Sequence, residues 1–359
     1  MARKRSPLSN LVKRSLNINW LLVFVPIAVA ADLAHQPLLA FATAAAAIIP
    51  LAGLIGRSTD QLAIHVGPGL GGLLNASFGN LTELIVGVFL VLAGDFEVLK
   101  ASLIGSIVGN LLLVLGLSFF VGGIGKSEQH FNARLASVHS ASLFLAIGGL
   151  LIPVLLLFSP RHVGAWEKSV LAIGVAGTLM LLYVAALIFM QITHKHMFRT
   201  PAADEHAEWS RRLALLVLVG AALAVGLESE ILVSSLQPTL AKVNISPAFV
   251  GLILIPVIGN AAEHSSAIFF AVRNKVDVTL EIAIGSSTQV ALFVAPAMVF
   301  VSFALGRPMD FVFTVFQIGA VVIATLVVSL IVADGRSNWL EGLQLLAVYF
   351  IIAFVAFFL

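Results

Sequence analysis

Long apolar runs follow one another along most of this sequence, and short charged or Pro/Gly-rich stretches separate them. A helix of about 20 apolar residues is long enough to cross a bilayer. A soluble protein of 359 residues needs a polar surface, which a chain that is 60% hydrophobic and only 11% charged cannot supply. The expected fold is therefore an all-α polytopic membrane protein. Eleven transmembrane helices are predicted, over residues 19–34, 37–56, 67–93, 99–122, 135–158, 166–192, 212–227, 247–272, 276–303, 311–333 and 339–359.

The positions of Lys and Arg support this order of helices. With the N-terminus in the cytoplasm, fifteen of them fall on the cytoplasmic side and five on the other, as the positive-inside rule expects. The basic N-terminus and first apolar run also fit a cleaved signal peptide, although a retained first helix agrees better with the membrane-embedded segments that follow. Residues 58–66 are expected to form a separate amphipathic helix before the third span. Four parts are predicted: a basic segment with the first helix (1–36), a five-helix unit (37–192), a hydrophilic linker (193–211) and a second five-helix unit (212–359).

Two copies of one short motif interrupt the apolar runs, GNLTE at 79–83 and GNAAE at 259–263. An offset of 180 residues aligns 79–110 with 259–290, and eight of these 32 positions are identical. The first copy lies in the third predicted helix and the second in the eighth, so the two run in opposite directions through the membrane. This pattern is typical of the inverted-topology repeats of secondary transporters, whose binding site lies near the bilayer midplane.

The residue types of the motif indicate a cation site. A carboxylate at the centre of a membrane helix costs on the order of 2.5–3.5 kcal/mol, so two of them in matching places predict a charge-handling role. Asn and Glu three residues apart share one helical face, and the Gly before each Asn, with Pro256 in the second copy, weakens the helix and frees backbone carbonyls. An all-oxygen, doubly negative site suits Ca²⁺, and Mn²⁺ less selectively. The predicted metal ligands are Glu83, Glu263, Asn80, Asn260, Gly79 and Gly259.

The same glutamates are the predicted proton-coupling residues. Two carboxylates close together in a low dielectric cannot both stay ionised cheaply, so protons and the metal ion compete for them. This competition is sufficient for exchange if the empty, charged site cannot move between its two access states. His264 directly follows Glu263 and is either a proton relay or gate, or a satisfied polar side chain.

Small and polar residues in the fourth and ninth predicted helices have two compatible interpretations. They form a packing face, which membrane helices commonly use, or they line a cavity beside the glutamates. The cavity-lining candidates are Ser106, Asn110, Ser286 and Gln289.

Two further groups of titratable residues lie outside these motifs. Glu228 and Glu230 are expected at a solvated helix end, with a cation funnel as the alternative. The linker histidines, His194, His196 and His206, are expected to be solvated, with a weak metal-sensing patch as the alternative.

Several stretches are similar to one transporter family. GGLLNASFGN at 71–80, running into Glu83, resembles the first signature of the calcium/proton exchanger (CAX) family, and GNAAEH at 259–264 resembles the second. GSSTQ at 285–289 and ADGRSNWLEG at 333–342 are similar to further stretches of that family. The family belongs to the cation/Ca²⁺ antiporter superfamily. The resemblance implies eleven spans with two inverted five-helix repeats, and export or sequestration of Ca²⁺ in exchange for protons, with Glu83 and Glu263 as Ca²⁺ ligands.

The departures from that family also carry information. The linker lacks the long acidic run of some eukaryotic members and the N-terminus lacks their extended regulatory region, which points to a prokaryotic-type exchanger of the plasma (inner) membrane. Sodium/calcium exchangers of the superfamily carry Ser/Thr-Pro-Glu or Ser-x-Pro-Asp motifs, which do not occur at these positions. The resemblance therefore favours protons over sodium as the counter-ion.

The predicted function is a secondary active Ca²⁺/H⁺ antiporter that works by alternating access, and not an enzyme. A Na⁺-coupled or Mn²⁺-preferring exchanger is the alternative, while a cation channel agrees less well with inverted repeats in one chain. An intramembrane metalloprotease would need a His-Glu-x-x-His pair, which the sequence lacks. Ca²⁺ and H⁺ are the expected transported ions and the lipid bilayer the expected surroundings. No resident cofactor and no nucleic acid are expected, and a homo-oligomer is left open.

Overall fold

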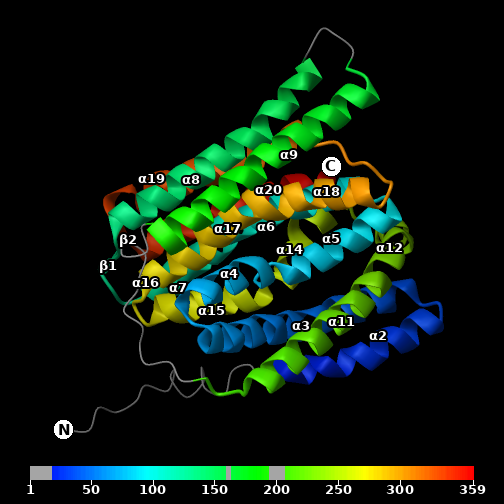
Figure 1. Cartoon of the computed structure of the whole chain (residues 1–359), viewed down its shortest axis with the longest axis horizontal. Helices are drawn as coiled ribbons and strands as arrows, with labels where there is room; N and C mark the ends of the chain where they lie inside the picture. Colours follow the sequence, from blue (N-terminus) through cyan, green and yellow to red (C-terminus); the bar gives the residue numbers. More distant parts are fainter. Residues whose placement is uncertain (1–17, 159–162, 194–206) are drawn as a thin grey trace.

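The computed structural model describes residues 18–158, 163–193 and 207–359, and nearly all of them lie in helices (Figure 1). The predicted basic residues of the N-terminus and the three linker histidines lie outside the described residues. In chain order, the first half contains η1 (Ile18–Val23), α2 (Phe24–Leu33), α3 (Pro37–Val66), α4 (Pro68–Phe78), α5 (Leu81–Ala93), α6 (Phe96–Val108), η2 (Gly109–Val114), α7 (Leu115–Gly123), β1 (Gln129–His130), α8 (Ala133–Leu151), η3 (Ile152–Phe158), α9 (Ala165–Ile188) and η4 (Phe189–Thr193).

The second half has more breaks in its helices than the first. Its elements are α11 (Arg211–Ser234), α12 (Leu236–Val243), α13 (Pro247–Phe249), η5 (Val250–Leu254), α14 (Ile255–Gly259), α15 (Ala261–Val272), α16 (Val276–Leu280), η6 (Glu281–Gly285), α17 (Ser286–Gln289), η7 (Val290–Val294), α18 (Ala295–Ala304), α19 (Val315–Ile331), η8 (Val332–Asp334), β2 (Arg336–Ser337) and α20 (Trp339–Phe358). The segments η2, η4, η5, η6 and η7 are π-helical turns that continue the neighbouring α-helices.

Helices of membrane-spanning length dominate the described residues. Eight are long and apolar enough to cross a bilayer, and a ninth crossing is the bent pair Pro247–Gly259 and Ala261–Val272. Two shorter apolar helices, Asn19–Leu33 and Leu81–Ala93, accompany them. The prediction of an all-α, multi-pass membrane protein is confirmed.

The separate helix predicted at residues 58–66 is wrong. These residues continue α3, which runs unbroken over 30 residues from Pro37 to Val66. The polar residues that suggested a new helix are satisfied inside the old one, because the Ser58 hydroxyl donates to Leu54 O at 2.5 Å and the Thr59 hydroxyl to Ile55 O at 2.9 Å.

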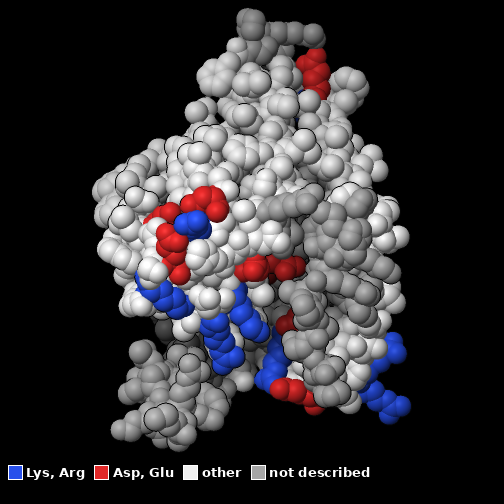
Figure 2. Space-filling model, turned by 90° about the vertical axis from the view of Figure 1, so that its left-hand side faces the viewer, with Lys and Arg blue, Asp and Glu red and all other residues white. Residues whose placement is uncertain are grey.

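The helices form a bundle with three regions (Figure 1). α2, α3 and α11 pack together on one side, while α8 packs against α19 and α9 against α18 on the opposite side. The broken helices α4–α5 and α14–α15 lie between these groups. At one end, β1 and β2 pair antiparallel with Gln129 opposite Ser337, so the two halves of the chain are joined there. Acidic and basic side chains gather on the face at this end (Figure 2).

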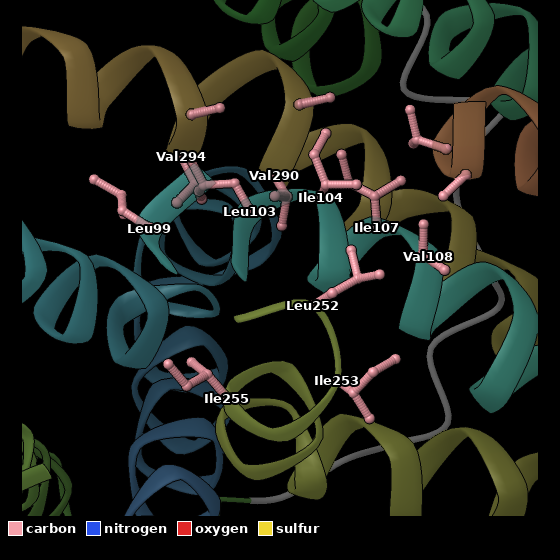
Figure 3. Close-up of a cluster of buried hydrophobic side chains, with 14 of the residues drawn as sticks. Leu99, Leu103, Ile104, Ile107, Val108, Leu252, Ile253, Ile255, Val290 and Val294 are labelled. Atoms are coloured by element: carbon pink, nitrogen blue, oxygen red, sulfur yellow. The ribbon is translucent and has the colours of Figure 1, made fainter. Parts of the chain in front are cut away.

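The centre of the core is α6, whose residues from Val98 to Val108 are buried apart from Lys100. Figure 3 shows its apolar side chains meeting those of η5, α14 and η7, which all belong to the second half. Most of this helix is therefore shielded from solvent, and its buried polar atoms need partners inside the protein.

Candidate functional site

Both motif copies break a helix at the same residue. Asn80 lies between α4 and α5, and Asn260 lies between α14 and α15. Their backbone angles nearly coincide, with φ −99° and ψ 21° at Asn80 and φ −100° and ψ 10° at Asn260. In the second copy the two helical segments meet at 63°. The predicted broken helices are thus present, and the two copies share one local structure.

Glu83 and Glu263 each lie in the first turn of the helix that follows the break. The N–H groups of a first helical turn have no partners within the helix and carry partial positive charge. A carboxylate there gains typically 0.3–1 kcal/mol at an exposed site. The break therefore gives each glutamate a favourable position that an uninterrupted helix would not provide.

The fold brings the two glutamates to one place. Glu83 and Glu263 are close enough for their charges to repel each other, and Asn260 adjoins Glu83. Ser286 in turn adjoins Glu263. The site is therefore shared by both halves of the chain, with each glutamate in contact with a residue of the other half or of the facing helix.

Hydrogen bonds donated by Nδ2 fix the orientation of three asparagine side chains. Asn80 Nδ2 donates to Gln289 Oε1 at 2.7 Å, and Asn110 Nδ2 donates to Ser286 Oγ at 3.2 Å. Asn260 Nδ2 donates to Ser106 Oγ at 3.2 Å and to Pro256 O at 3.1 Å. All four predicted cavity-lining residues, Ser106, Asn110, Ser286 and Gln289, thus take part in hydrogen bonds of these three asparagine side chains.

Several buried oxygen atoms in this region have no hydrogen-bond partner. The buried atoms without a hydrogen-bond partner include Oδ1 of Asn80, Asn110 and Asn260 and Oε2 of Glu83 and Glu263. Buried polar atoms are rarely unpaired in native structures, because each costs about 1–3 kcal/mol. These five unpaired atoms are all acceptors, and they belong to the two glutamates and to the asparagines beside them or on the facing helix. This donor set fits a hard cation such as Ca²⁺, which is bound by carboxylate and amide oxygens.

A small cavity reaches the first glutamate. Its lining includes Glu83, Ser102, Ser106, Pro256 and Gly259, and its volume is about 20 Å³, roughly the room that one water molecule needs. Ser102 was not among the predicted residues. It lies one helical turn before Ser106, and this spacing of four residues was the signal that could have identified it.

Gly105 allows α6 to reach the second broken helix. A Cβ atom at this position would overlap the backbone oxygen of Leu252 and the ring of Pro256. The packing interpretation of the small residues is therefore correct at Gly105, while its helix neighbour Ser106 contacts Asn260.

The remaining predicted residues have defined places. Gly259 lines the cavity, and the Gly79 amide N–H donates to Asn75 O at 2.9 Å. The His264 amide N–H donates to Asn260 O at 2.9 Å, which places this histidine in the same turn as Glu263. Within the three described ranges, no group of three Asp, Glu or His residues gathers as a metal cluster, so carboxylates and amides together would have to hold the ion.

The solvated position expected for Glu228 is wrong. Its side chain has 0% relative exposure, whereas Glu230, two residues further along α11, is exposed. The reason is the packing of α11 against α3 and α5, which covers the face that carries Glu228.

Comparison with known proteins places this geometry in a family. The family described as "Sodium/calcium exchanger protein" matches the chain twice, over residues 36–191 and 213–358. The chain belongs to this family. The chain is also similar to a "Ca(2+)/H(+) antiporter ChaA" of Bacillus subtilis, 43% identical over 93% of this chain and 96% of the relative. A "Ca(2+)/H(+) antiporter" of Aphanothece halophytica is 39% identical over 94% of this chain and 95% of the relative.

A solved structure has the same fold as this chain. The structure titled "Structure of native YfkE" superposes with a TM-score of 0.84 and 40% sequence identity, over 95% of this chain and all of that one. The resemblance to the calcium/proton exchangers that the motifs indicated is thereby confirmed. The relatives named here are transporters rather than enzymes.

Proposed function

We propose that this protein is a secondary active Ca²⁺/H⁺ antiporter in which Glu83 and Glu263 bind Ca²⁺ and protons in turn. The single observation that carries the proposal is the set of unpaired oxygens of Glu83, Glu263, Asn80 and Asn260, gathered from both halves of the chain. The names of the relatives, both Ca²⁺/H⁺ antiporters, support the same pair of ions.

The mechanism follows from what these oxygens can bind. With Ca²⁺ present, two carboxylates neutralise the ion and the amide oxygens of Asn80 and Asn260 complete its surroundings. When Ca²⁺ leaves, two facing carboxylates in a dry site repel each other, and protons replace the lost charge. The loaded forms are both neutralised, whereas the empty form is doubly charged and is held back from crossing between access states. Alternating access then couples the two fluxes, and we assign His264 as the proton relay to Glu263.

The proposed topology has eleven spans in two inverted five-helix repeats. The nine spanning units become eleven when the shorter apolar helices Asn19–Leu33 and Leu81–Ala93 are added, with Leu81–Ala93 completing the span that begins at α4. The two separate family matches support residues 37–192 and 212–359 as the repeats. We place the N-terminus in the cytoplasm and the protein in a prokaryotic plasma membrane, in agreement with the charge bias of the loops.

Proton-gradient-driven Ca²⁺ uptake into proteoliposomes tests the proposal. We expect uptake by the wild type, and no uptake above empty liposomes by Glu83→Gln or Glu263→Gln, because glutamine keeps the shape but neither neutralises Ca²⁺ nor exchanges protons. Glu97→Gln is the control, since Glu97 is an exposed residue of α6 and its loss leaves the site intact.

Other gradients decide between the alternatives. Uptake that a sodium gradient drives and a proton gradient does not would overturn the choice of counter-ion. Uptake of Mn²⁺ in strong preference to Ca²⁺ would overturn the choice of cation. Downhill Ca²⁺ flux without proton movement would indicate a channel.

A further inference from the structure

Glu228 is a second buried carboxyl group, and the proposed exchange site does not use it. Its side chain has 0% relative exposure, and neither of its oxygens has a hydrogen-bond partner. An ionised carboxylate without a donor or a cation is among the most costly groups that a membrane helix can hold. The neutral acid avoids most of that cost.

Among the described residues, no cation of the neighbouring helices pairs with Glu228. The charged and titratable groups on the helices packed against α11 are Asp32 on α2, Arg57, Asp60 and His65 on α3, Glu83 on α5 and Lys242 on α12.

These groups are accounted for elsewhere. Arg57 and His65 lie at the far end of α11, where both contact Trp209, and Asp60 belongs to the same end of α3. Lys242 and Asp32 are exposed. Of these groups, Glu83 is the one that the proposed exchange requires to gain and lose a proton, so it is the partner that we consider for Glu228.

The position of Glu228 along the membrane follows from two parallel helices. α5 and α11 pack side by side, and a Cβ on Gly226 would lie 4.0 Å from the ring of Phe89. They end at the same face, because Gln237, just after α11, donates to Asp95, just after α5, at 3.0 Å.

The depths of the two carboxyl groups can be compared on these helices. Glu83 lies ten residues before the end of α5 and Glu228 six residues before the end of α11. At 1.5 Å per residue, these are about 15 Å and about 9 Å from that face. Glu228 is therefore nearer to the face along the helix axes, by about 6 Å when both residues are counted from their helix ends and by about 12 Å when they are counted from the contact between Gly226 and Phe89. A chain of water molecules would have to cover this separation together with the distance across the two helices.

Two hydroxyl groups accompany Glu228 towards that face. Ser229 Oγ on α11 and Thr239 Oγ1 on α12 are buried and also have no hydrogen-bond partner. Hydroxyl groups both donate and accept, so they are suited to carry protons between water and an acid.

We propose that Glu228 is a proton-binding site on the route between Glu83 and the membrane face at which α5 and α11 end. When Ca²⁺ leaves towards this face, the neutral acid gives its proton through water to the Glu83 carboxylate, and the Glu228 carboxylate takes a new proton from the aqueous phase. When transport runs in the other direction and Ca²⁺ binds from this face, the reverse transfers release a proton to the same phase. This inference rests on the proposed function.

Infrared spectroscopy tests whether Glu228 holds a proton, without any transport. In the Glu83→Gln/Glu263→Gln protein at neutral pH, we expect a carbonyl band of a protonated carboxylic acid that Glu228→Gln removes and Glu228→Asp shifts. Glu230→Gln is the matched control, since this exposed neighbour on the same helix should leave the band unchanged. A band that Glu228→Gln does not alter would overturn the inference.

Transport tests the role of that proton. We expect Glu228→Gln to lower the rate of proton-driven Ca²⁺ uptake at least fivefold while equilibrium Ca²⁺ binding stays within twofold of the wild type, and Glu228→Asp to recover part of the rate. Wild-type rate and pH profile in Glu228→Gln would overturn the inference while leaving the proposed function intact. A wild type without proton-driven uptake would instead overturn the proposed function, and the infrared band would still decide whether Glu228 binds a proton.

Discussion

α6 and the corresponding segment of the second half, η6 and α17, carry the same Ile-Gly-Ser sequence, at 104–106 and 284–286, but they differ in backbone and packing. α6 is a regular helix through this sequence, whereas π-helical turns, η6 and η7, flank α17 in the counterpart. Gly105 is pressed against Leu252 and Pro256, while a Cβ on Gly285 would meet nothing within 4 Å.

The difference shows that the two copies share polar residues but not packing. Ser106 and Ser286 each accept a hydrogen bond from an asparagine amide, Ser106 from Asn260 and Ser286 from Asn110. Of the two serine-bearing helices, α6 is the one that packs closely against a broken helix. The second half has π-helical turns on both sides of its serine, whereas α6 is regular there. Such turns are frequent at functional sites, so the second half is where we expect the helix to adjust during transport.

The largest contrast is expected between Gly105→Ala and Gly285→Ala. The new methyl group at residue 105 would overlap backbone, so we expect the free energy of unfolding to fall by about 1–3 kcal/mol. At residue 285 the space is open, and a change within about 0.5 kcal/mol is expected. Thermal unfolding in detergent measures both. Equal shifts of the unfolding temperature in the two variants would contradict the difference in packing between the two positions.

A smaller contrast is expected between the motif asparagines. Asn260 donates to Ser106 and Pro256 and adjoins Glu83, while Asn80 donates to Gln289. We expect Asn260→Ala to weaken Ca²⁺ binding by about 1.5–3 kcal/mol and Asn80→Ala by about 1 kcal/mol. Titration of Ca²⁺ into purified protein measures this, with Ser265→Ala, an exposed position on α15, as the control. A larger loss of Ca²⁺ affinity in Asn80→Ala than in Asn260→Ala would contradict this order.

The smallest effect is expected where the halves touch at the surface. Arg57 on α3 bonds Glu208, just before α11, at 2.7 Å, but these side chains are 54% and 67% exposed. Exposed ion pairs contribute about 0–1 kcal/mol, so Glu208→Gln should hardly change the unfolding temperature. A shift as large as that of Gly105→Ala would mean that surface contacts, rather than α6, hold the halves together.

The sequence was sufficient for features that depend on local chemistry. Gly-Asn in an apolar run predicts a helix break, and both breaks lie at the predicted asparagines. The repeat and its spacing also predicted that Glu83 and Glu263 meet, because inverted repeats bring matching positions to one axis.

Features that depend on neighbours in space could not be predicted. The direction of each asparagine amide follows from partners on other helices, such as Gln289 and Ser286. The burial of Glu228 follows from helices that cover α11, and nothing in its own polar-apolar pattern indicates it. The unbroken α3 was missed because Ser58 and Thr59 satisfy their hydroxyls within the helix.

The most direct test of the account is the number of protons released when Ca²⁺ binds to the purified protein. Titration with a pH-sensitive dye in weak buffer measures it, in the wild type and in the Glu83→Gln, Glu263→Gln and double variants. If both ions share one site, Ca²⁺ binding should release protons in the pH range where the glutamates hold them, binding should tighten as pH rises through that range, and the double variant should show neither. Ca²⁺ binding with unchanged affinity and no proton release in the wild type, or full binding in the double variant, would contradict the account.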